Sequence, residues 1–139
     1  MSARPLLQVE DLRTWFPIRK GLFRRTVGHV RAVDGVDLAI EEGMSLALVG
    51  ESGCGKTTVG RSILCLERAL EGRVWYDGVD LLRLPAQELR PYRSDLQIVF
   101  QDPMASLNPR MRVRDVIAEG MHSFGIGASE SERTDRVSA

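Results

Sequence analysis

Residues 44–58 read MSLALVGESGCGKTT, and this stretch decides the fold class. The apolar run SLALV shows no polar alternation, which is typical of a strand covered on both faces in a parallel or mixed sheet. A glycine-rich turn follows it. Residues 56–67 then place Val59, Ile63 and Leu66 at helical spacing. The order of strand, glycine turn and helix predicts an α/β protein.

The glycine turn has the pattern of a phosphate-binding loop. Gly50, Gly55, Lys56 and Thr57 match G-x-x-x-x-G-K-[ST], the phosphate loop of nucleotide triphosphatases. Glycines let the backbone curl until its N–H groups point at an anion, and the start of the helix adds its positive end. A chance glycine loop with a surface lysine is the alternative, but it requires neither the apolar run before the turn nor a lysine inside the first helical turn.

Each side chain of this loop has a predicted role. Lys56 would reach the β- and γ-phosphates of ATP, the Thr57 hydroxyl would bind Mg²⁺, and Thr58 would contact the α-phosphate. The predicted nucleotide-binding residues of the loop are Gly50, Glu51, Ser52, Gly53, Cys54, Gly55, Lys56, Thr57 and Thr58.

Composition sets broad limits on the class of protein. The 139 residues suffice for one ordinary domain, and 43% hydrophobic with 27% charged residues is typical of a soluble globular chain. The net charge is zero, so charge balance suggests neither nucleic acid nor anionic lipid as a partner. Cys54 and Cys65 form no disulfide framework, which favours a reducing compartment. No signal peptide or apolar run of roughly 20 residues is present, so we expect a cytosolic or peripheral protein.

The remaining segments alternate between strand and helix patterns. Between strands predicted at 6–12 and 33–40 we expect a long solvated connection over 17–29, which contains Arg19, Lys20, Arg24 and Arg25. Such a basic cluster either contacts lipid headgroups or acidic partners, or is a plain soluble loop. A strand and turn are predicted at 73–81, with Asp77-Gly78 as the turn residues. Helical turns at 85–93, a strand at 95–100 and a helix at 113–121 should follow. A last helix should begin at Ser129, because Ser129 and Glu132 have capping-box spacing.

Four segments resemble the ATP-binding subunit of ABC transporters: GESGCGKTT, VDGVDLAIEEG, GRVWYDGVDL and SDLQIVFQDPMASLNPRM. The last is the most specific and looks like the oligopeptide and dipeptide importer branch, which is related to nickel importers. The resemblance covers essentially residues 6–139. It implies a P-loop NTPase core with an N-terminal antiparallel β subdomain, truncated before the second half of the domain. Residues 1–139 would be the N-terminal portion of one nucleotide-binding domain.

The resemblance also implies roles for residues outside the loop. Phe16 looks like the aromatic that stacks on adenine, although ordinary packing of Trp15 and Phe16 is the alternative. Gln101 looks like the glutamine that bridges Mg²⁺ and the attacking water and senses the membrane partner, although a plain hydrogen-bonding residue is the alternative. Residues 104–111 would face the permease. Gln101 and Lys56 are the candidate catalytic residues.

Partners and catalytic competence follow from the same resemblance. It implies ATP and Mg²⁺ as cofactors. It also implies as partners the transmembrane subunits of a permease, a second ATPase subunit in a head-to-tail dimer and, indirectly, an extracytoplasmic peptide-binding protein. The implied location is the cytoplasmic face of the inner membrane, and no nucleic acid is implied as a partner. The family's signature loop, its strand with a catalytic glutamate and its switch histidine are not recognisable, and neither His29 nor His122 matches. We therefore expect a fragment that does not hydrolyse ATP alone. A small-molecule kinase and a non-catalytic nucleotide-binding module are the alternative functions.

Overall fold

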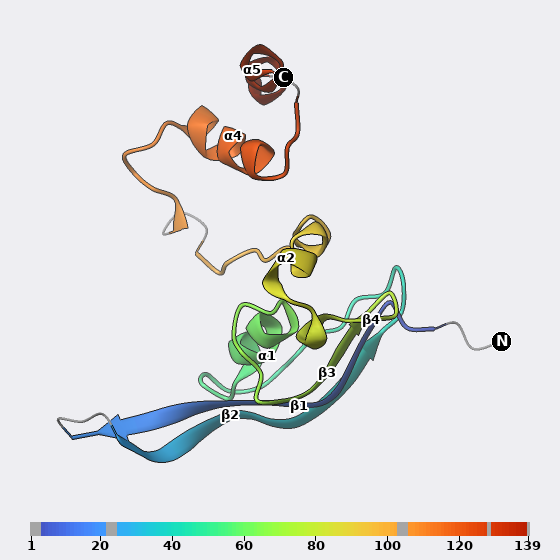
Figure 1. The fold of residues 1–139 in the computed structure, drawn as a ribbon, viewed down its shortest axis with the longest axis vertical. Coiled ribbons are helices and arrows are strands. Elements are labelled where there is room, and N and C mark those ends of the chain that lie inside the picture. Colours follow the sequence, from blue (N-terminus) through green and yellow to red (C-terminus); the bar gives the residue numbers. More distant parts are fainter. Residues whose placement is uncertain (1–3, 22–24, 103–105, 128, 139) are drawn as a thin grey trace. The chain divides into compact units, whose positions relative to one another are not determined.

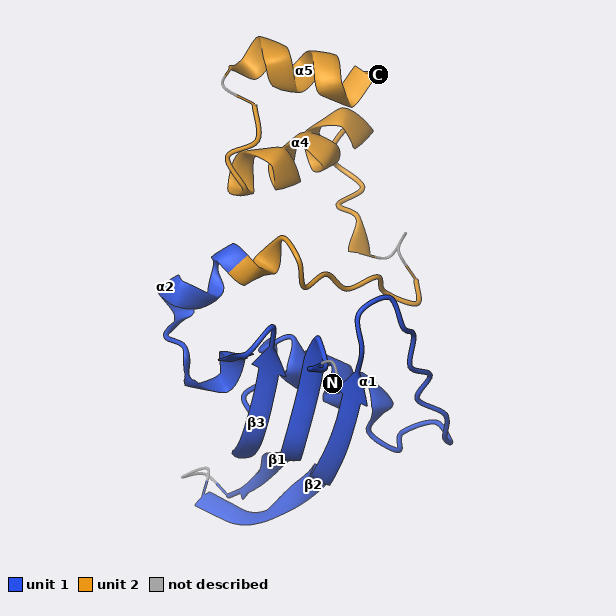
Figure 2. Cartoon of the chain, turned by 90° about the vertical axis from the view of Figure 1, so that its right-hand side faces the viewer, with its two compact units in different colours: residues 1–91 blue, residues 92–139 orange. Residues whose placement is uncertain are grey.

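The computed structural model describes residues 4–21, 25–102, 106–127 and 129–138. The chain divides into two compact units, residues 1–91 and 92–139 (Figure 2). Each unit is described by itself.

The first unit is built on a four-stranded antiparallel sheet (Figure 1). Its strands lie in the order β2-β1-β3-β4, and every neighbouring pair is antiparallel. This confirms the strands predicted at 6–12, 33–40 and 73–81, and both Asp77 and Gly78 adopt the positive φ that a tight turn requires. The bounds are β1 Leu7–Lys20, β2 Arg25–Ile40, β3 Glu71–Tyr76 and β4 Val79–Asp80.

The β1–β2 hairpin is longer than the sequence pattern indicates. Pairing runs from Leu7 opposite Ile40 to Lys20 opposite Arg25, so most of the predicted loop over 17–29 is strand. Residues 22–24 lie outside the described part. Because β3 pairs with β1 only as far as Arg13, the hairpin continues past that point as a two-stranded ribbon.

Helix α1, Lys56–Ile63, covers one face of the sheet (Figure 1). The hydroxyl groups of Thr14 on β1 and Ser62 on α1 are both buried and lie 2.8 Å apart, within hydrogen-bond distance. The helix ends four residues before the predicted Glu67, because Cys65 takes a φ of +52° and the amides of Leu66 and Glu67 both donate to the Arg61 carbonyl. The buried apolar side chains are Val9, Leu12, Val33, Val59, Val74 and Leu81.

Two of the predicted strands are wrong. Residues 45–49 and 95–100 form no strand, and Val49 and Val99 are 93% and 88% exposed. Within the described residues, the amides of residues 45–50 and 97–100 donate to no backbone carbonyl. Apolar composition predicts that a segment can be buried, but a strand also needs a neighbour to pair its backbone groups. The described sheet offers these segments no such neighbour.

The helical predictions agree better with the structure. The helical turns expected at 85–93 are present, and Pro85 is the N-cap residue of the first of them. In the second unit, the Glu132 amide donates to Ser129 Oγ at 3.1 Å, as the capping-box spacing predicts. None of the helices in the described ranges has the length and apolar character to cross a membrane. The helix bounds are η1 Leu81–Arg83, α2 Ala86–Leu89, η2 Pro91–Arg93, α4 Val113–Ser123 and α5 Glu130–Ser138.

Candidate phosphate-binding site

The glycine turn leads directly into α1 and depends on glycine at specific positions. Gly53 and Gly55 have φ values of +83° and +97°, in the left-handed region that disfavours other residues. A Cβ atom on Gly55 would collide with the carbonyl oxygen of Ala32. One on Gly50 would lie 2.8 Å from Cys54 Sγ, closer than Cβ atoms normally come. Positions 53 and 55 therefore favour glycine through their backbone conformation, and position 55 also through its close approach to Ala32.

Backbone amides are available at the start of α1. The first backbone hydrogen bond of the helix runs from the Val59 amide to the carbonyl of the N-cap Gly55, at 2.9 Å. The amides of Lys56, Thr57 and Thr58 precede that bond, and Gly55 has no side chain to cap them. Within the turn, the Cys54 amide makes a long bond of 3.4 Å to the Glu51 carbonyl. Unsatisfied amides at a helix start favour an anion.

The ammonium group of Lys56 lies against the turn itself. Its Nζ donates to the carbonyls of Gly50 and Glu51 at 2.8 and 2.6 Å, and Cys54 Sγ is 3.4 Å away. The carbonyls thus hold the positive charge inside the loop. An incoming anion would have to draw the ammonium off these carbonyls, which a multiply charged phosphate group can do because charge-assisted hydrogen bonds are the stronger kind.

The hydroxyl of Thr57 is the candidate metal ligand in this loop. Thr57 is exposed, and its hydroxyl makes no hydrogen bond to any described residue. A hydroxyl oxygen suits Mg²⁺, which takes its remaining ligands from phosphate and water. No group of three or more histidine, cysteine or acidic side chains in the described ranges could hold a metal by itself. The donor set therefore fits an ion that arrives with a nucleotide.

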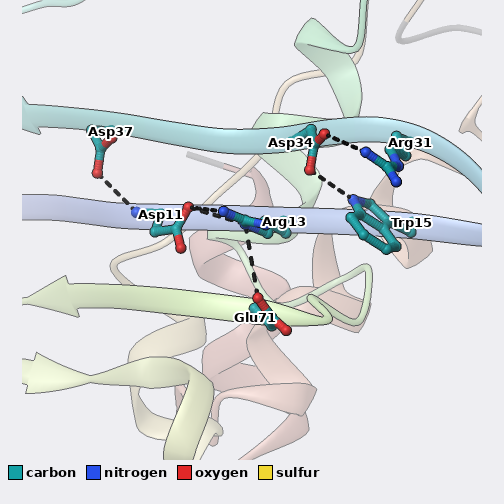
Figure 3. A network of polar contacts seen from close by, with 7 residues as sticks. All are labelled: Asp11, Arg13, Trp15, Arg31, Asp34, Asp37 and Glu71. Atoms are coloured by element: carbon teal, nitrogen blue, oxygen red, sulfur yellow. Dashed lines mark hydrogen bonds and ion pairs between the residues drawn. The ribbon is translucent and has the colours of Figure 1, made fainter.

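The two adjacent aromatics of β1 point to opposite faces of the hairpin. Phe16 lies two residues beyond Thr14, whose side chain contacts α1, so strand alternation directs Phe16 to the helix face, where it is 39% exposed. Trp15 points to the other face, donates from Nε1 to Asp34 at 3.2 Å, and has the Arg31 guanidinium 4.5 Å from its ring centre (Figure 3). Of the two rings, Phe16 has the better orientation for a ligand near α1.

Sequence reasoning missed the polar network around Trp15 on the outer face of the sheet. Arg13 donates to Asp11 at 3.0 Å and lies 3.8 Å from Glu71 on β3, and the Asp11 amide donates to Asp37 (Figure 3). The hydrogen bond to Asp11 and its negative charge raise the pKa of Arg13 above its ordinary value. Opposite charges at facing strand positions were the available signal.

Gln101 belongs to the second unit and is not placed relative to the loop. It is exposed and lies in no helix or strand. Of the segment 104–111, residues 104 and 105 lie outside the described part. The structure therefore brings together the loop residues and α1, while Gln101 stays a sequence-based prediction.

Comparisons with known proteins agree with this geometry. The family model described as ABC transporter matches residues 33–139. The chain is 44% identical over 133 residues to the oligopeptide transport ATP-binding protein AppF of Bacillus subtilis (strain 168), which covers 95% of this chain and 40% of AppF. It is 46% identical over 136 residues to OppF of Salmonella typhimurium, which covers 96% of this chain and 41% of OppF. The chain thus spans about 40% of the length of these curated relatives.

A solved structure supports the fold. The chain is similar to the dimeric structure of the ATP-binding cassette MJ0796 in a post-hydrolysis state bound to ADP and Pi, with a TM-score of 0.74 and 26% identity. The match covers 94% of this chain and 53% of the MJ0796 chain. The fold class is therefore the expected α/β P-loop NTPase type with an N-terminal antiparallel β subdomain. From the family model and the loop geometry together, we conclude that the chain belongs to the ABC transporter family.

Proposed function

We propose that this chain is the ATP-binding part of a subunit that energises the import of peptides through an ABC permease. The observation that carries the proposal is the loop at residues 50–58, where left-handed glycines, uncapped amides and Lys56 converge at the start of α1. The similarity to AppF and OppF, which are named as oligopeptide transport ATP-binding proteins, supports peptides as the cargo. Nickel is the alternative cargo, because that importer branch shares the segment after residue 94.

In this proposal each part of the site acts on one part of the nucleotide. The amides of residues 50–58 bind the phosphates, Lys56 neutralises the β- and γ-phosphates, and Thr57 contributes a ligand to Mg²⁺. Phe16 stacks on the adenine, a contact worth roughly 1–3 kcal/mol by analogy with base stacking on aromatics. Gln101 has the role that the resemblance implies, which is to contact Mg²⁺ and the attacking water.

We further propose that residues 1–139 are the N-terminal portion of one nucleotide-binding domain. The match to 53% of the MJ0796 chain supports this, because that chain is an ATP-binding cassette. ATP hydrolysis is assigned to the assembled domain and not to these residues alone. The dimeric MJ0796 structure supports a second ATPase subunit as a partner, next to the permease and a peptide-binding protein. The subunit would then lie at the cytoplasmic face of the inner membrane.

The direct test is nucleotide affinity after replacement of Lys56. The sequence has only two lysines, Lys20 and Lys56, so Lys20→Ala is a matched control that removes the same charge outside the loop. Hydrogen bonds to charged groups are worth about 1.5–3 kcal/mol, so Lys56→Ala should weaken ATP binding about 10- to 100-fold. Titration calorimetry with Mg²⁺ and a non-hydrolysable ATP analogue measures this.

The affinity of the Lys20→Ala control shows whether a loss of binding is specific to Lys56. Lys20→Ala should bind the analogue with the affinity of the unmodified chain. Equal affinity of Lys56→Ala and Lys20→Ala would remove the phosphate-binding role of the loop, and with it the proposal.

A further inference from the structure

The far part of the β1–β2 hairpin concentrates positive charge in a chain that is neutral as a whole. The sequence has 19 basic and 19 acidic residues, but residues 14–33 contain five basic residues and no acidic one. The local excess is therefore hidden by the overall balance. This local excess of positive charge should destabilise the hairpin, because like charges on one hairpin repel one another.

Three of these cations have no partner in the described part of the chain. Arg19, Lys20 and Arg25 are exposed at the end of the ribbon, where Lys20 lies opposite Arg25 and Arg19 opposite Thr26. None of the three forms an ion pair with a described residue. The basic residues nearer the sheet behave differently, since Arg13 pairs with Asp11 and Arg31 with Asp34. Among the described residues of the hairpin, the unpaired cations thus lie at the end that extends beyond β3.

Exposed apolar side chains lie beside these cations. Ile18 is 38% exposed and Val27 58%. Val27 lies at the register shift between Ile18 and Arg19, so it has no residue directly opposite. We name Ile18, Arg19, Lys20, Arg25 and Val27 the hairpin end. Cations mixed with exposed aliphatic groups are the chemistry that binds the surface of an anionic bilayer, where headgroups take the charge and the interface takes the apolar groups.

We propose that the hairpin end binds the anionic headgroups of a phospholipid membrane directly. An acidic protein surface would match the charge, but it would leave Ile18 and Val27 without apolar partners, so the lipid surface is the better fit. This contact goes beyond the proposed function and does not depend on it, since no residue of the hairpin end belongs to the nucleotide loop. It would hold this unit at the membrane independently of a permease.

The experiment measures how the full chain partitions onto vesicles. One variant carries Arg19→Gln, Lys20→Gln and Arg25→Gln. A control carries Arg68→Gln, Arg73→Gln and Arg112→Gln, which are also exposed and unpaired among the described residues, so both variants lose the same charge. Co-sedimentation with phosphatidylcholine vesicles, with and without phosphatidylglycerol, gives the partition coefficient. Circular dichroism checks that both variants keep their secondary structure.

The expected result is specific to the hairpin end. Each cation near an anionic surface is worth about fivefold in binding, so the hairpin variant should lose roughly 100-fold in partitioning onto phosphatidylglycerol vesicles. The control should lose little. Added salt should weaken binding of the unmodified chain.

Two outcomes would overturn the proposal. An equal loss in both variants would mean that only net charge matters. No difference between the two vesicle types, combined with tight binding of the unmodified chain to polyglutamate, would identify an acidic protein as the partner. If the hairpin variant unfolds, Ile18→Ser with Val27→Ser tests the same surface, because it should reduce partitioning without changing the charge.

Discussion

Gly53 and Gly55 have similar backbone conformations in the loop, but their surroundings differ. Both have positive φ values, +83° and +97°. A Cβ atom on Gly53 would meet nothing within 4 Å, whereas one on Gly55 would collide with the backbone of Ala32 on β2. At the scale of single residues, therefore, one glycine is required by conformation alone and the other also by close approach to the sheet.

This contrast gives a paired prediction. Gly53→Ala should lower the free energy of unfolding by about 1–2 kcal/mol, the cost of a left-handed conformation for a residue with a Cβ. Gly55→Ala should cost clearly more, because a carbonyl oxygen cannot move aside as a flexible side chain can, and it should also weaken nucleotide binding. Urea unfolding of both variants measures the difference. Equal losses would show that β2 shifts freely to accept the extra methyl group.

At the scale of elements, one buried hydrogen bond joins α1 to the sheet. Thr14 is 1% exposed and Ser62 is fully buried, so neither hydroxyl can turn to water. Ser62→Ala would leave the Thr14 hydroxyl unsatisfied and should destabilise the first unit by about 1–3 kcal/mol. Thr14→Val combined with Ser62→Ala should recover most of this loss, because both polar groups are then gone. Thermal unfolding of the two single variants and the double variant completes a double-mutant cycle. If the changes in the free energy of unfolding were strictly additive, the two hydroxyls would not interact.

The elements also show where sequence patterns succeed. The β3–β4 turn at Asp77-Gly78 and the Ser129 cap of α5 were predictable, because their causes lie within a few residues of each other. While the phosphate-binding role of residues 50–58 stays a prediction, the glycine turn that leads into α1 was predictable for the same reason. The length of the β1–β2 ribbon was not, since cross-strand pairing adds order that basic residues do not signal. The strand predictions for 45–49 and 95–100 were wrong because a strand needs a neighbouring strand to pair with, and local composition does not reveal that neighbour.

At the scale of the whole molecule, residues 45–49 and 95–100 are two segments that expose apolar side chains. Val49 and Val99 are almost fully exposed, one in each unit. Among the described residues, the amides around them donate to no backbone carbonyl. Exposed apolar segments of this kind promote association between chains.

The chain should therefore self-associate as its concentration rises. Val49→Ser with Val99→Ser should reduce this association, measured by light scattering or analytical ultracentrifugation. Val27→Ser with Val113→Ser is the matched control, since these valines are 58% and 73% exposed but lie outside the two segments. Similar behaviour of the two double variants would mean that exposed area alone, and not these segments, drives association.

If the loop binds nucleotide as proposed, the position of Lys56 has a consequence for nucleotide exchange. Its ammonium donates to the carbonyls of Gly50 and Glu51. When the phosphates leave, the Lys56 ammonium could then return to these two carbonyls. These hydrogen bonds would hold the loop in its present conformation. Rebinding would then require only that Lys56 exchange carbonyl oxygens for phosphate oxygens, without a change in the backbone. This favours fast nucleotide association.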